Sequence, residues 1–438
     1  MRISVPAMIG RQSTTPRLRP APALDGIAPI NLARALQHLD GLVFFDTAGN
    51  LAAGQANALS VIAARPRAIH RGSIHSTSDA AALSSIVAGA EASPGPDTGM
   101  PVGGLCGWVD YEGDFVFGDY PEMLVFRHAD SRWWESGALS QEMREPKPAV
   151  AVAIGPLTAQ RDREWFLDGV RRIREWIRSG DIYQVNLTQA FDAEVNGGSL
   201  FGLYEILREV SPAPMAAWLA LDDREVLGSS PETFLRMSGR TVETRPIKGT
   251  RPRFSDPDED TRSAYELQTS PKEAAELVMI TDLLRNDLGR ICDFGTVEVA
   301  EMLRLESLGQ VHHLVSSVNG RLRPGVGHVE ALASCFPGGS ITGAPKKRAM
   351  EIIREIEGAP RGIYCGAVGW LGYHGESCFN IAIRTIVRQG GRMRCQVGAG
   401  IVADSDPAME YDETLHKAAG MKLAIQRFLQ QNRVSHPA

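Results

Sequence analysis

The chain has 438 residues, of which 43% are apolar and 22% are charged, a composition typical of a soluble globular protein of two or three domains. Its 46 basic and 52 acidic residues give a formal net charge of −6. This charge provides no positive field to attract nucleic acid, so we expect no nucleic-acid partner. No run of about 20 apolar residues is present, so we expect no membrane partner either.

Six cysteines are scattered along the chain without a C-x-x-C pair, which is too sparse for a disulfide framework. We expect buried, reduced thiols in a cytoplasmic protein. Residues 1–24 contain four prolines among serines and threonines, a composition that predicts a disordered N-terminal tail. The four arginines that precede the first acidic residue, Asp25, also resemble a transit peptide, but we favour the disordered tail.

Residues 143–148 contain two prolines and mark the expected boundary between an N-terminal subdomain, 25–150, and a catalytic domain, 151–438. Apolar residues at helical spacing predict a helix over 165–179, and alternation predicts a strand over 183–191. A second helix is expected over 271–284, with Ser270 as its N-cap. Further helices are expected at 344–356 and 407–428, and further strands at 366–373, 378–388 and 392–397, the last two joined by a hairpin at 389–391. Hairpins alternating with helices favour an α+β fold.

Two pairs of glutamates have the spacing of one helix face: Glu273 with Glu276, and Glu410 with Glu413. Such pairs are usually solvated helix surface, but apolar residues surround the first pair and a glycine-rich strand end precedes the second. Two facing carboxylate pairs form an oxygen-rich site that suits Mg²⁺. Four ionised glutamates would over-charge one ion, so we expect two of them to bind it directly and the other two to act through water.

Eight motifs in the second half of the chain occur together. They are DIYQVNLT at 181–188, SPE at 230–232, PIKGTR at 246–251, DLLRNDLG at 282–289, VHHLVS at 311–316, FPGGSITGAPK at 336–346, GAGIV at 398–402 and DETLHK at 412–417. In this order they resemble the chorismate-utilising enzyme family, over about residues 160–430. The resemblance implies an anthranilate synthase component I-like fold: two antiparallel sheets packed face to face, with helices outside and the site in the cleft.

Two positions bear on the reaction. Isochorismate and salicylate synthases carry a water-activating lysine where this chain has Gln184, so the resemblance points to ammonia as the nucleophile. The PIKGT motif around Lys248 is similar to component I of aminodeoxychorismate synthases, which serve para-aminobenzoate and folate synthesis, whereas component I of anthranilate synthases typically has alanine there. The alternatives are anthranilate synthase component I and a non-catalytic, chorismate-binding regulatory homologue.

The resemblance implies that Lys248 adds to C2 of chorismate as the C4 hydroxyl leaves, and that ammonia then adds at C4. A free lysine has a pKa near ~10.4, so only about 0.1% of it is amine at pH 7.5. We expect Arg245, Arg251 and desolvation to lower that pKa. Glu232 is the expected general acid, a role that requires burial to raise its pKa.

His313 is expected near the leaving hydroxyl, where it is either catalytic or only structural. The remaining residues that the resemblance places around chorismate are expected to bind its carboxylates and ring: Ser340, Tyr364, Arg384, the Gly400 backbone and Lys417. We assign no regulatory tryptophan-binding site to the N-terminal part of the chain, about residues 1–150.

No cysteine stands in the G-x-C-x-G turn that a glutamine amidotransferase needs. Cys106, for example, lies in GLCGW, and Cys365 lies in IYCGA. We therefore expect that this chain cannot hydrolyse glutamine and that a separate glutamine amidotransferase subunit, component II, supplies the ammonia.

Overall fold

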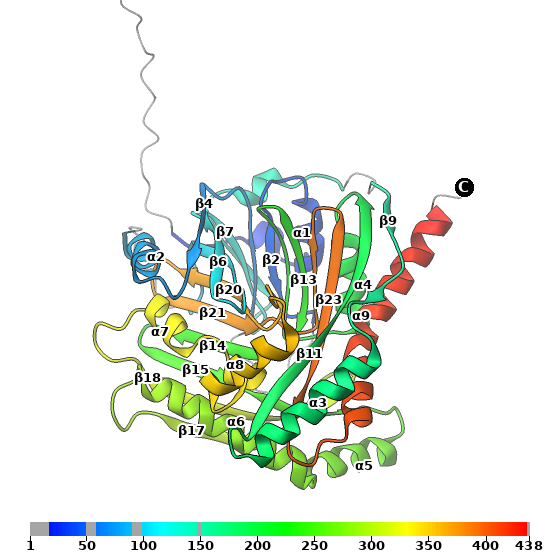
Figure 1. Ribbon diagram of the computed structural model, residues 1–438. Coiled ribbons are helices and arrows are strands. Elements are labelled where there is room, and N and C mark those ends of the chain that lie inside the picture. Colours follow the sequence, from blue (N-terminus) through cyan, green and yellow to red (C-terminus); the bar gives the residue numbers. More distant parts are fainter. Residues whose placement is uncertain (1–16, 50–57, 90–98, 147–149, 436–438) are drawn as a thin grey trace, which may run out of the picture.

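The computed structural model of the chain describes residues 17–49, 58–89, 99–146 and 150–435. Within this part, two sheets form the centre of the molecule, and every strand pairing in them is antiparallel. Helices lie around the sheets (Figure 1). The predicted α+β fold with two antiparallel sheets is confirmed.

The larger sheet has 13 strands in the described part of the chain. Its strands, in spatial order, are β1 (Arg19–Pro20), β8 (Arg132–Ser136), β7 (Met123–Arg127), β3 (Leu59–Ala63), β2 (Val43–Asp46), β12 (Met215–Leu221), β13 (Arg224–Ser230), β22 (Thr385–Gln389), β23 (Arg392–Ile401), β11 (Gln184–Gly197) and β10 (Thr158–Ala159), with β19 (Gly343–Ala344) and β9 (Val152–Ile154) also paired to β11.

The smaller sheet has ten strands among the described residues. They are β16 (Ile247–Pro252), β18 (Val311–Arg321), β15 (Thr241–Arg245), β14 (Thr233–Ser238), β21 (Glu376–Ile381), β20 (Ala367–Gly372), β5 (Gly104–Val109), β6 (Asp114–Tyr120) and β4 (Ala68–Ser73), with β17 (Glu298–Ser307) on the other side of β18.

The helices connect and cover these strands. They are α1 (Pro29–Ala35), α2 (Thr77–Gly89), α3 (Arg163–Arg178), α4 (Phe201–Val210), α5 (Pro257–Gln268), α6 (Pro271–Gly289), α7 (His328–Cys335), α8 (Lys346–Glu357) and α9 (Pro407–Ser435), with short 3-10 turns η1 (Pro22–Leu24), η2 (Leu139–Glu142) and η3 (Gly339–Ile341). No helix in the described segments has the length and apolar character needed to span a bilayer.

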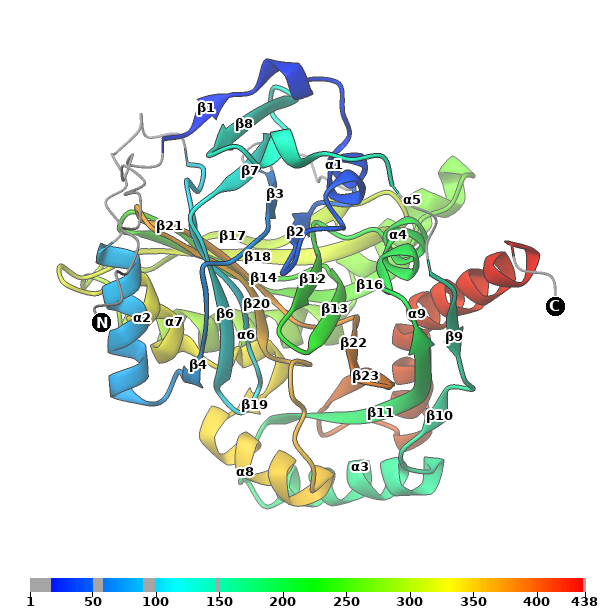
Figure 2. The same cartoon turned by 90° about the horizontal axis from the view of Figure 1, so that it is seen from above.

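Strand β2 shows how the layers pack, because both of its faces are buried. Val43 and Phe45 point into the core between the two sheets, where they meet residues of the smaller sheet such as Trp370. Phe44, between them in sequence, points to the opposite face and packs in the core under α1, α4 and α9. Successive side chains of this one strand thus pack in two different hydrophobic cores. Figure 2 shows the two sheets edge-on, with α3 and α8 beside β11.

The predicted helices are present as α3, α6, α8 and α9, with ends that differ by a few residues. Ser270 caps α6 as predicted, since its side chain accepts a hydrogen bond from the Glu273 backbone N–H at 3.4 Å. The predicted hairpin is also confirmed: Gln389 pairs with Arg392 across two glycines, and Gly390 has a φ of +57°.

The predicted single strand over 378–388 is wrong. The chain forms β21 in the smaller sheet, leaves it, and enters the larger sheet as β22. Between these strands Arg384 adopts a φ of +50°, a left-handed conformation that interrupts the extended backbone. Apolar residues on both sides of Arg384 conceal this crossing, which carries Arg384 into the gap between the sheets.

The N-terminal part contributes to both sheets. Strand β2 pairs with β12, and β5 pairs with β20, so the boundary predicted near residue 150 does not separate two sheets. Of the predicted tail, residues 1–16 lie outside the described part, whereas residues 17–24 include β1, which pairs with β8, and η1. Residues 147–149 of the predicted boundary also lie outside the described part.

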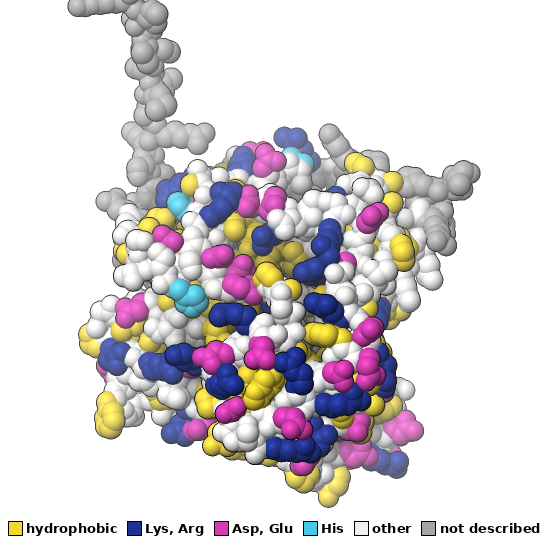
Figure 3. All heavy atoms as spheres, in the orientation of Figure 1, with side chains coloured by type: hydrophobic (Ala, Val, Ile, Leu, Met, Phe, Trp, Pro, Cys, Tyr) yellow, Lys and Arg dark blue, Asp and Glu magenta, His cyan; other side chains and the backbone are white. Residues whose placement is uncertain are grey.

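Acidic and basic side chains are intermixed on the face of the molecule shown in Figure 3. Local ion pairs occur at the surface of the described residues, such as that of Arg171 in α3 with Glu164 at 2.9 Å. The six cysteines are buried and unpaired, as expected.

Candidate active site

A cavity of about 540 Å³ lies where strands of both sheets meet α6 and α9. Eleven of the twelve residues predicted for the site line it: Glu232, Lys248, Glu273, Glu276, His313, Ser340, Tyr364, Arg384, Gly400, Glu413 and Lys417. They come from strands, loops and helices spread over nearly 190 residues of sequence, so only the fold brings them together. Glu410 does not line the cavity.

Glu232 lies between β13 and β14 and is almost fully buried. Burial raises the pKa of its carboxyl from the ordinary 4.5 to about 7, while a hydrogen bond from Ser340 and the charge of Lys248 oppose this rise. A carboxyl with a pKa near neutrality exists in both protonation states at physiological pH. Glu232 therefore has the property that a general acid requires.

Lys248 is placed by a bulge in β16. Lys248 pairs with Leu314 of β18, and Thr250 pairs with the next residue, His313, so Gly249 is the extra residue, with a φ of +70°. The Nζ of Lys248 lies 3.5 Å from an Oε2 of Glu276. The lysine is thus the nucleophile candidate that faces the cavity, held in an ion pair with one of the expected metal ligands.

The two arginines expected to activate Lys248 have other partners. Arg245 binds Glu306 and lies 3.8 Å from Glu301. Arg251 lies 3.9 Å from Glu273. Their charges are therefore offset by glutamates, a pairing between distant segments that the sequence did not reveal.

Gly400 lies beside Lys248 and Gln184. A Cβ at this position would lie 2.2 Å from the Gln184 Nε2 and 3.4 Å from the Lys248 Nζ. No side chain can be accommodated there without displacing the buried glutamine amide. The Gly400 backbone forms part of the cavity wall.

His313 is buried, and burial, followed by the charge of Arg384, lowers the pKa of its imidazole to about 4. Its Nδ1 lies 3.2 Å from the carbonyl oxygen of Gly249 and 3.1 Å from the Thr250 Oγ1. Because a carbonyl only accepts, Nδ1 carries the proton of the neutral ring. Nε2 has no hydrogen-bond partner among the described residues and keeps its lone pair. His313 can therefore accept a proton or a hydrogen bond at Nε2.

Two cations of the cavity differ in how they are compensated. Burial lowers the pKa of Arg384, but a guanidinium remains charged near neutral pH. Arg384 has no ion-pair partner within the described segments. Lys417 lies 2.7 Å from Glu413 and donates to the carbonyl of Gly398 at 3.0 Å. Arg384 is thus the group best suited to bind a substrate carboxylate.

Each of the four predicted metal glutamates lies beside a basic side chain. In addition to the pairs described above, Glu410 lies 3.6 Å from Lys272 of α6. Glu410 is buried behind the cavity wall and accepts a hydrogen bond from the Ser405 hydroxyl at 2.6 Å. Against the lowering effect of burial, the charges of Glu410, Glu276 and the other two glutamates raise the pKa of Lys272. Sequence reasoning missed Lys272, although it directly precedes Glu273.

The donor chemistry of this cluster suits Mg²⁺. Three of the four glutamates present carboxylates to one cavity. Burial and then the neighbouring charge of Glu276 raise the pKa of Glu273. A divalent cation would offset the repulsion between these two carboxylates. As the side chains stand in the described segments, no three acidic, histidine or cysteine groups are arranged to hold one ion together. Metal binding therefore requires Lys248, Arg251 and Lys417 to release these carboxylates.

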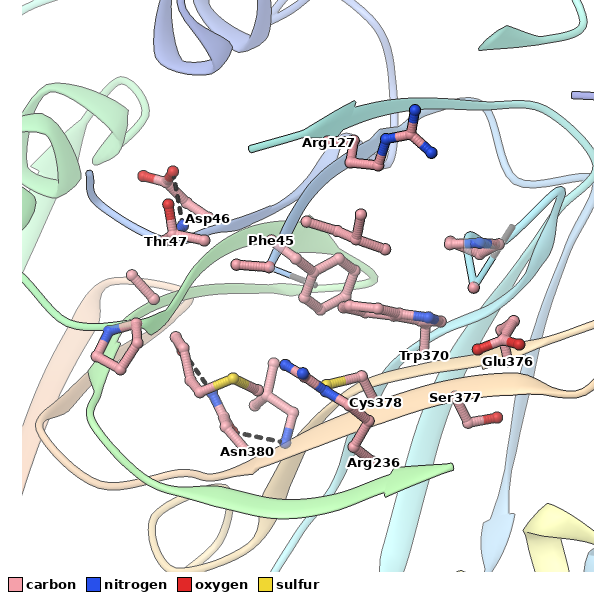
Figure 4. Close-up of a pocket in the computed structure, with 18 of the residues that line it drawn as sticks. Phe45, Asp46, Thr47, Arg127, Arg236, Trp370, Glu376, Ser377, Cys378 and Asn380 are labelled. Atoms are coloured by element: carbon pink, nitrogen blue, oxygen red, sulfur yellow. Dashed lines mark hydrogen bonds between the residues drawn. The ribbon is translucent and has the colours of Figure 1, made fainter. Parts of the chain in front are cut away.

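A second cavity, of about 360 Å³, lies between the sheets in a region where the sequence predicted no site. Figure 4 shows Phe45 and Trp370 on its wall, with ring centroids 5.0 Å apart. Asp46 beside them accepts a hydrogen bond from Arg208 at 2.8 Å. Asn380 donates to the carbonyl of Met215 at 2.9 Å. The polar groups named here are thus engaged with other parts of the chain.

Residues 103–423 match the family described as chorismate binding enzyme. The chain belongs to this family. Over 341 residues it is 41% identical to anthranilate synthase component 1 of Methanothermobacter thermautotrophicus, with 72% of this chain and 73% of that protein aligned. Over 285 residues it is 44% identical to aminodeoxychorismate synthase component 1 of Bacillus subtilis, with 65% and 59% aligned.

The crystal structure of anthranilate synthase component I from Streptococcus pneumoniae superposes on this family member with a TM-score of 0.71. The two share 29% sequence identity, and the superposition covers 83% of this chain and 92% of the other. The family resemblance read from the motifs and the anthranilate synthase component I-like fold are thus both confirmed. The names of the relatives divide between the two synthases. The comparisons therefore support a chorismate-utilising enzyme and do not distinguish the two activities.

Proposed function

We propose that this chain is component I of an aminodeoxychorismate synthase, which converts chorismate and ammonia to 4-amino-4-deoxychorismate. The observation that carries the proposal is Lys248, an amine that lines the cavity together with the buried Glu232. In the family resemblance described above, component I of aminodeoxychorismate synthases has a lysine at this position, whereas component I of anthranilate synthases typically has alanine.

The reaction follows from these two side chains. The free amine of Lys248 forms a bond to C2 of chorismate, both ring double bonds shift by one position, and the C4–O bond breaks. Glu232 donates its proton to the departing hydroxyl, which leaves as water. Ammonia then forms a bond to C4, both double bonds return to their original positions, and the bond between Lys248 and C2 breaks. The new C4 ammonium can return a proton to the Glu232 carboxylate. The ion pair of Lys248 with Glu276 must open before the first step.

The remaining residues bind and orient the substrate. Arg384 and Tyr364 are suited to the enolpyruvyl carboxylate, with the backbone of Gly400, while Ser340 and Lys417 complete the wall. Glu276 and Glu413 would hold Mg²⁺, with Glu273 and Glu410 acting through water. When bound, the ion would neutralise the ring carboxylate of chorismate.

Ammonia requires a source, because the sequence has no glutaminase turn. We propose that a separate glutamine amidotransferase subunit delivers it. We further propose that the enzyme acts in the cytoplasm, in the supply of para-aminobenzoate for folate synthesis.

Anthranilate synthase component I is the second candidate. Relatives that carry this name support it, whereas His313 does not distinguish the two activities. A non-catalytic homologue is disfavoured, since the acid, the amine and three of the four metal glutamates all line one cavity.

Mass spectrometry of the product from chorismate, Mg²⁺ and ammonium separates the candidates. Amination with the enolpyruvyl group retained supports the proposal. Anthranilate with free pyruvate would replace it with the second candidate, and unchanged chorismate would favour the non-catalytic homologue.

A further inference from the structure

Behind the cavity wall lies a buried ion pair of Arg361 and Glu357. Their exposed fractions are 3% and 8%, and neither residue lines the cavity. Arg361 donates from Nε to one carboxylate oxygen of Glu357 at 2.9 Å and from Nη2 to the other at 2.7 Å. Such a two-point pair fixes the plane of the guanidinium.

The remaining donors of Arg361 are directed at the backbone of two wall segments. Nη1 donates to the carbonyl of Ile341 at 3.0 Å, and Nη2 donates to the carbonyl of Asn186 at 2.7 Å. Both Ile341 and Asn186 line the cavity. Arg361 thus joins η3 to strand β11, segments about 155 residues apart in sequence.

Other contacts hold the pair itself in place. The Thr188 backbone N–H donates to Glu357 at 3.0 Å, and Glu112 accepts from the Arg361 backbone N–H at 2.8 Å. The guanidinium also lies 4.5 Å from the ring centroid of Tyr111. These contacts come from several different parts of the chain, so the guanidinium has little freedom to move.

The connection to chemistry runs through Ser340, which precedes Ile341, lines the same cavity as Glu232 and forms a hydrogen bond to its carboxyl. A shift of η3 would therefore move the hydrogen-bond partner of the general acid. The cations that face substrate carboxylates, Arg384 and Lys417, lie next to β22 and on α9, and the Arg361 side chain contacts neither. Arg361 is thus linked to the acid and not to the binding cations.

We propose that Arg361, oriented by Glu357, is a positioning residue that fixes Ser340 relative to Glu232, so that the acid is aligned with the departing hydroxyl. This inference rests on the proposed role of Glu232. A buried ion pair is weak evidence for stability, since apolar residues of similar size often replace one without loss. The same guanidinium binds two backbone carbonyls of the cavity wall, which indicates that it holds the wall in place. Positional errors of about half an ångström in a catalytic site reduce catalysis.

The first test is Arg361→Lys, which keeps the charge but has a single nitrogen that cannot serve Glu357 and two carbonyls together. We expect kcat for chorismate consumption to fall at least about tenfold, with KM within about threefold of wild type. Arg172→Lys is the matched control. Arg172 of α3 pairs at the surface with Glu355, which lies on α8, the helix that also carries Glu357. A wild-type kcat in Arg361→Lys would refute the inference.

The second test separates positioning from stability. Arg361→Met leaves a buried, unpaired Glu357, so we expect a lower melting temperature and a lower kcat. In the double variant Arg361→Met/Glu357→Leu, an apolar pair replaces the ion pair, so the melting temperature should recover much of its loss. Its kcat should stay low, because the carbonyls of Asn186 and Ile341 still lack their donor. If kcat recovers with the melting temperature, the pair is only structural.

Chorismate consumption is measured in all variants, and the wild-type product is identified separately. A wild-type enzyme that makes anthranilate would refute the proposed function and leave this test in force, because the C4 hydroxyl departs there too.

Discussion

Replacing Glu232 by glutamine tests the general acid in two ways, because its raised pKa affects both activity and stability. With a pKa of about 7, the carboxyl is ~90% protonated at pH 6, 50% at pH 7 and about 1% at pH 9. Only the protonated form can donate to the leaving hydroxyl. The rate that depends on Glu232 therefore approaches its full value below about pH 6, is halved at pH 7, and falls about tenfold per pH unit well above pH 7.

Other groups titrate in the same range, so the ratio of wild-type to Glu232→Gln rates is the quantity to measure. General acids contribute roughly 10²- to 10⁴-fold, so we expect a ratio of this size at pH 6. It should fall about fiftyfold between pH 7 and pH 9, as the protonated fraction does. Chorismate consumption is followed in buffers from pH 6 to 9. A ratio that does not change across this range would show that Glu232 is not the acid.

The same pKa makes a prediction that does not depend on activity. The folded protein binds the Glu232 proton more tightly than the unfolded chain, whose carboxyl has the ordinary pKa of 4.5, against about 7 in the folded state. Stability is therefore lost as pH rises from 4.5 to 7, by about 3 kcal/mol, and is constant above that range. Glu232→Gln lacks this loss. Denaturant unfolding should show the variant gaining stability relative to wild type between pH 4.5 and 7, and equal pH dependence would contradict the burial argument.

Three further predictions concern the nucleophile, the metal and the nitrogen source. Lys248→Ala should depress amination strongly while chorismate binding stays within about tenfold of wild type; wild-type turnover, or failure to trap a Lys248 adduct without ammonia, would refute the assignment. Glu276→Gln and Glu413→Gln should abolish Mg²⁺-dependent activity, because an amide is a weaker, neutral ligand; exposed Glu259→Gln is the control, and calorimetry showing unaltered Mg²⁺ and chorismate binding in both site variants would remove the metal site. The chain alone should use ammonium and not glutamine until a glutamine amidotransferase subunit is added; sustained glutamate release by the chain alone would contradict the partner hypothesis.

The sequence by itself determined the features that depend on neighbouring residues. The start of α6 was predictable because the N-cap of Ser270 involves a residue three positions away. The hairpin at residues 389–391 was predictable because two glycines separate two strands. The order of the motifs also identified which residues would share one site, and eleven of the twelve do line one cavity.

The tertiary structure decided the features that depend on burial and on distant contacts. The crossing between the sheets at Arg384 could not be predicted, because an arginine carries no sequence signal for its left-handed φ. The raised pKa of Glu232 requires its burial, and Lys272 meets Glu410 from a helix almost 140 residues away. Arg361 likewise has no motif of its own to indicate a role. Its function depends on carbonyls supplied by remote segments, and only the folded chain brings a guanidinium and those oxygens within hydrogen-bond distance.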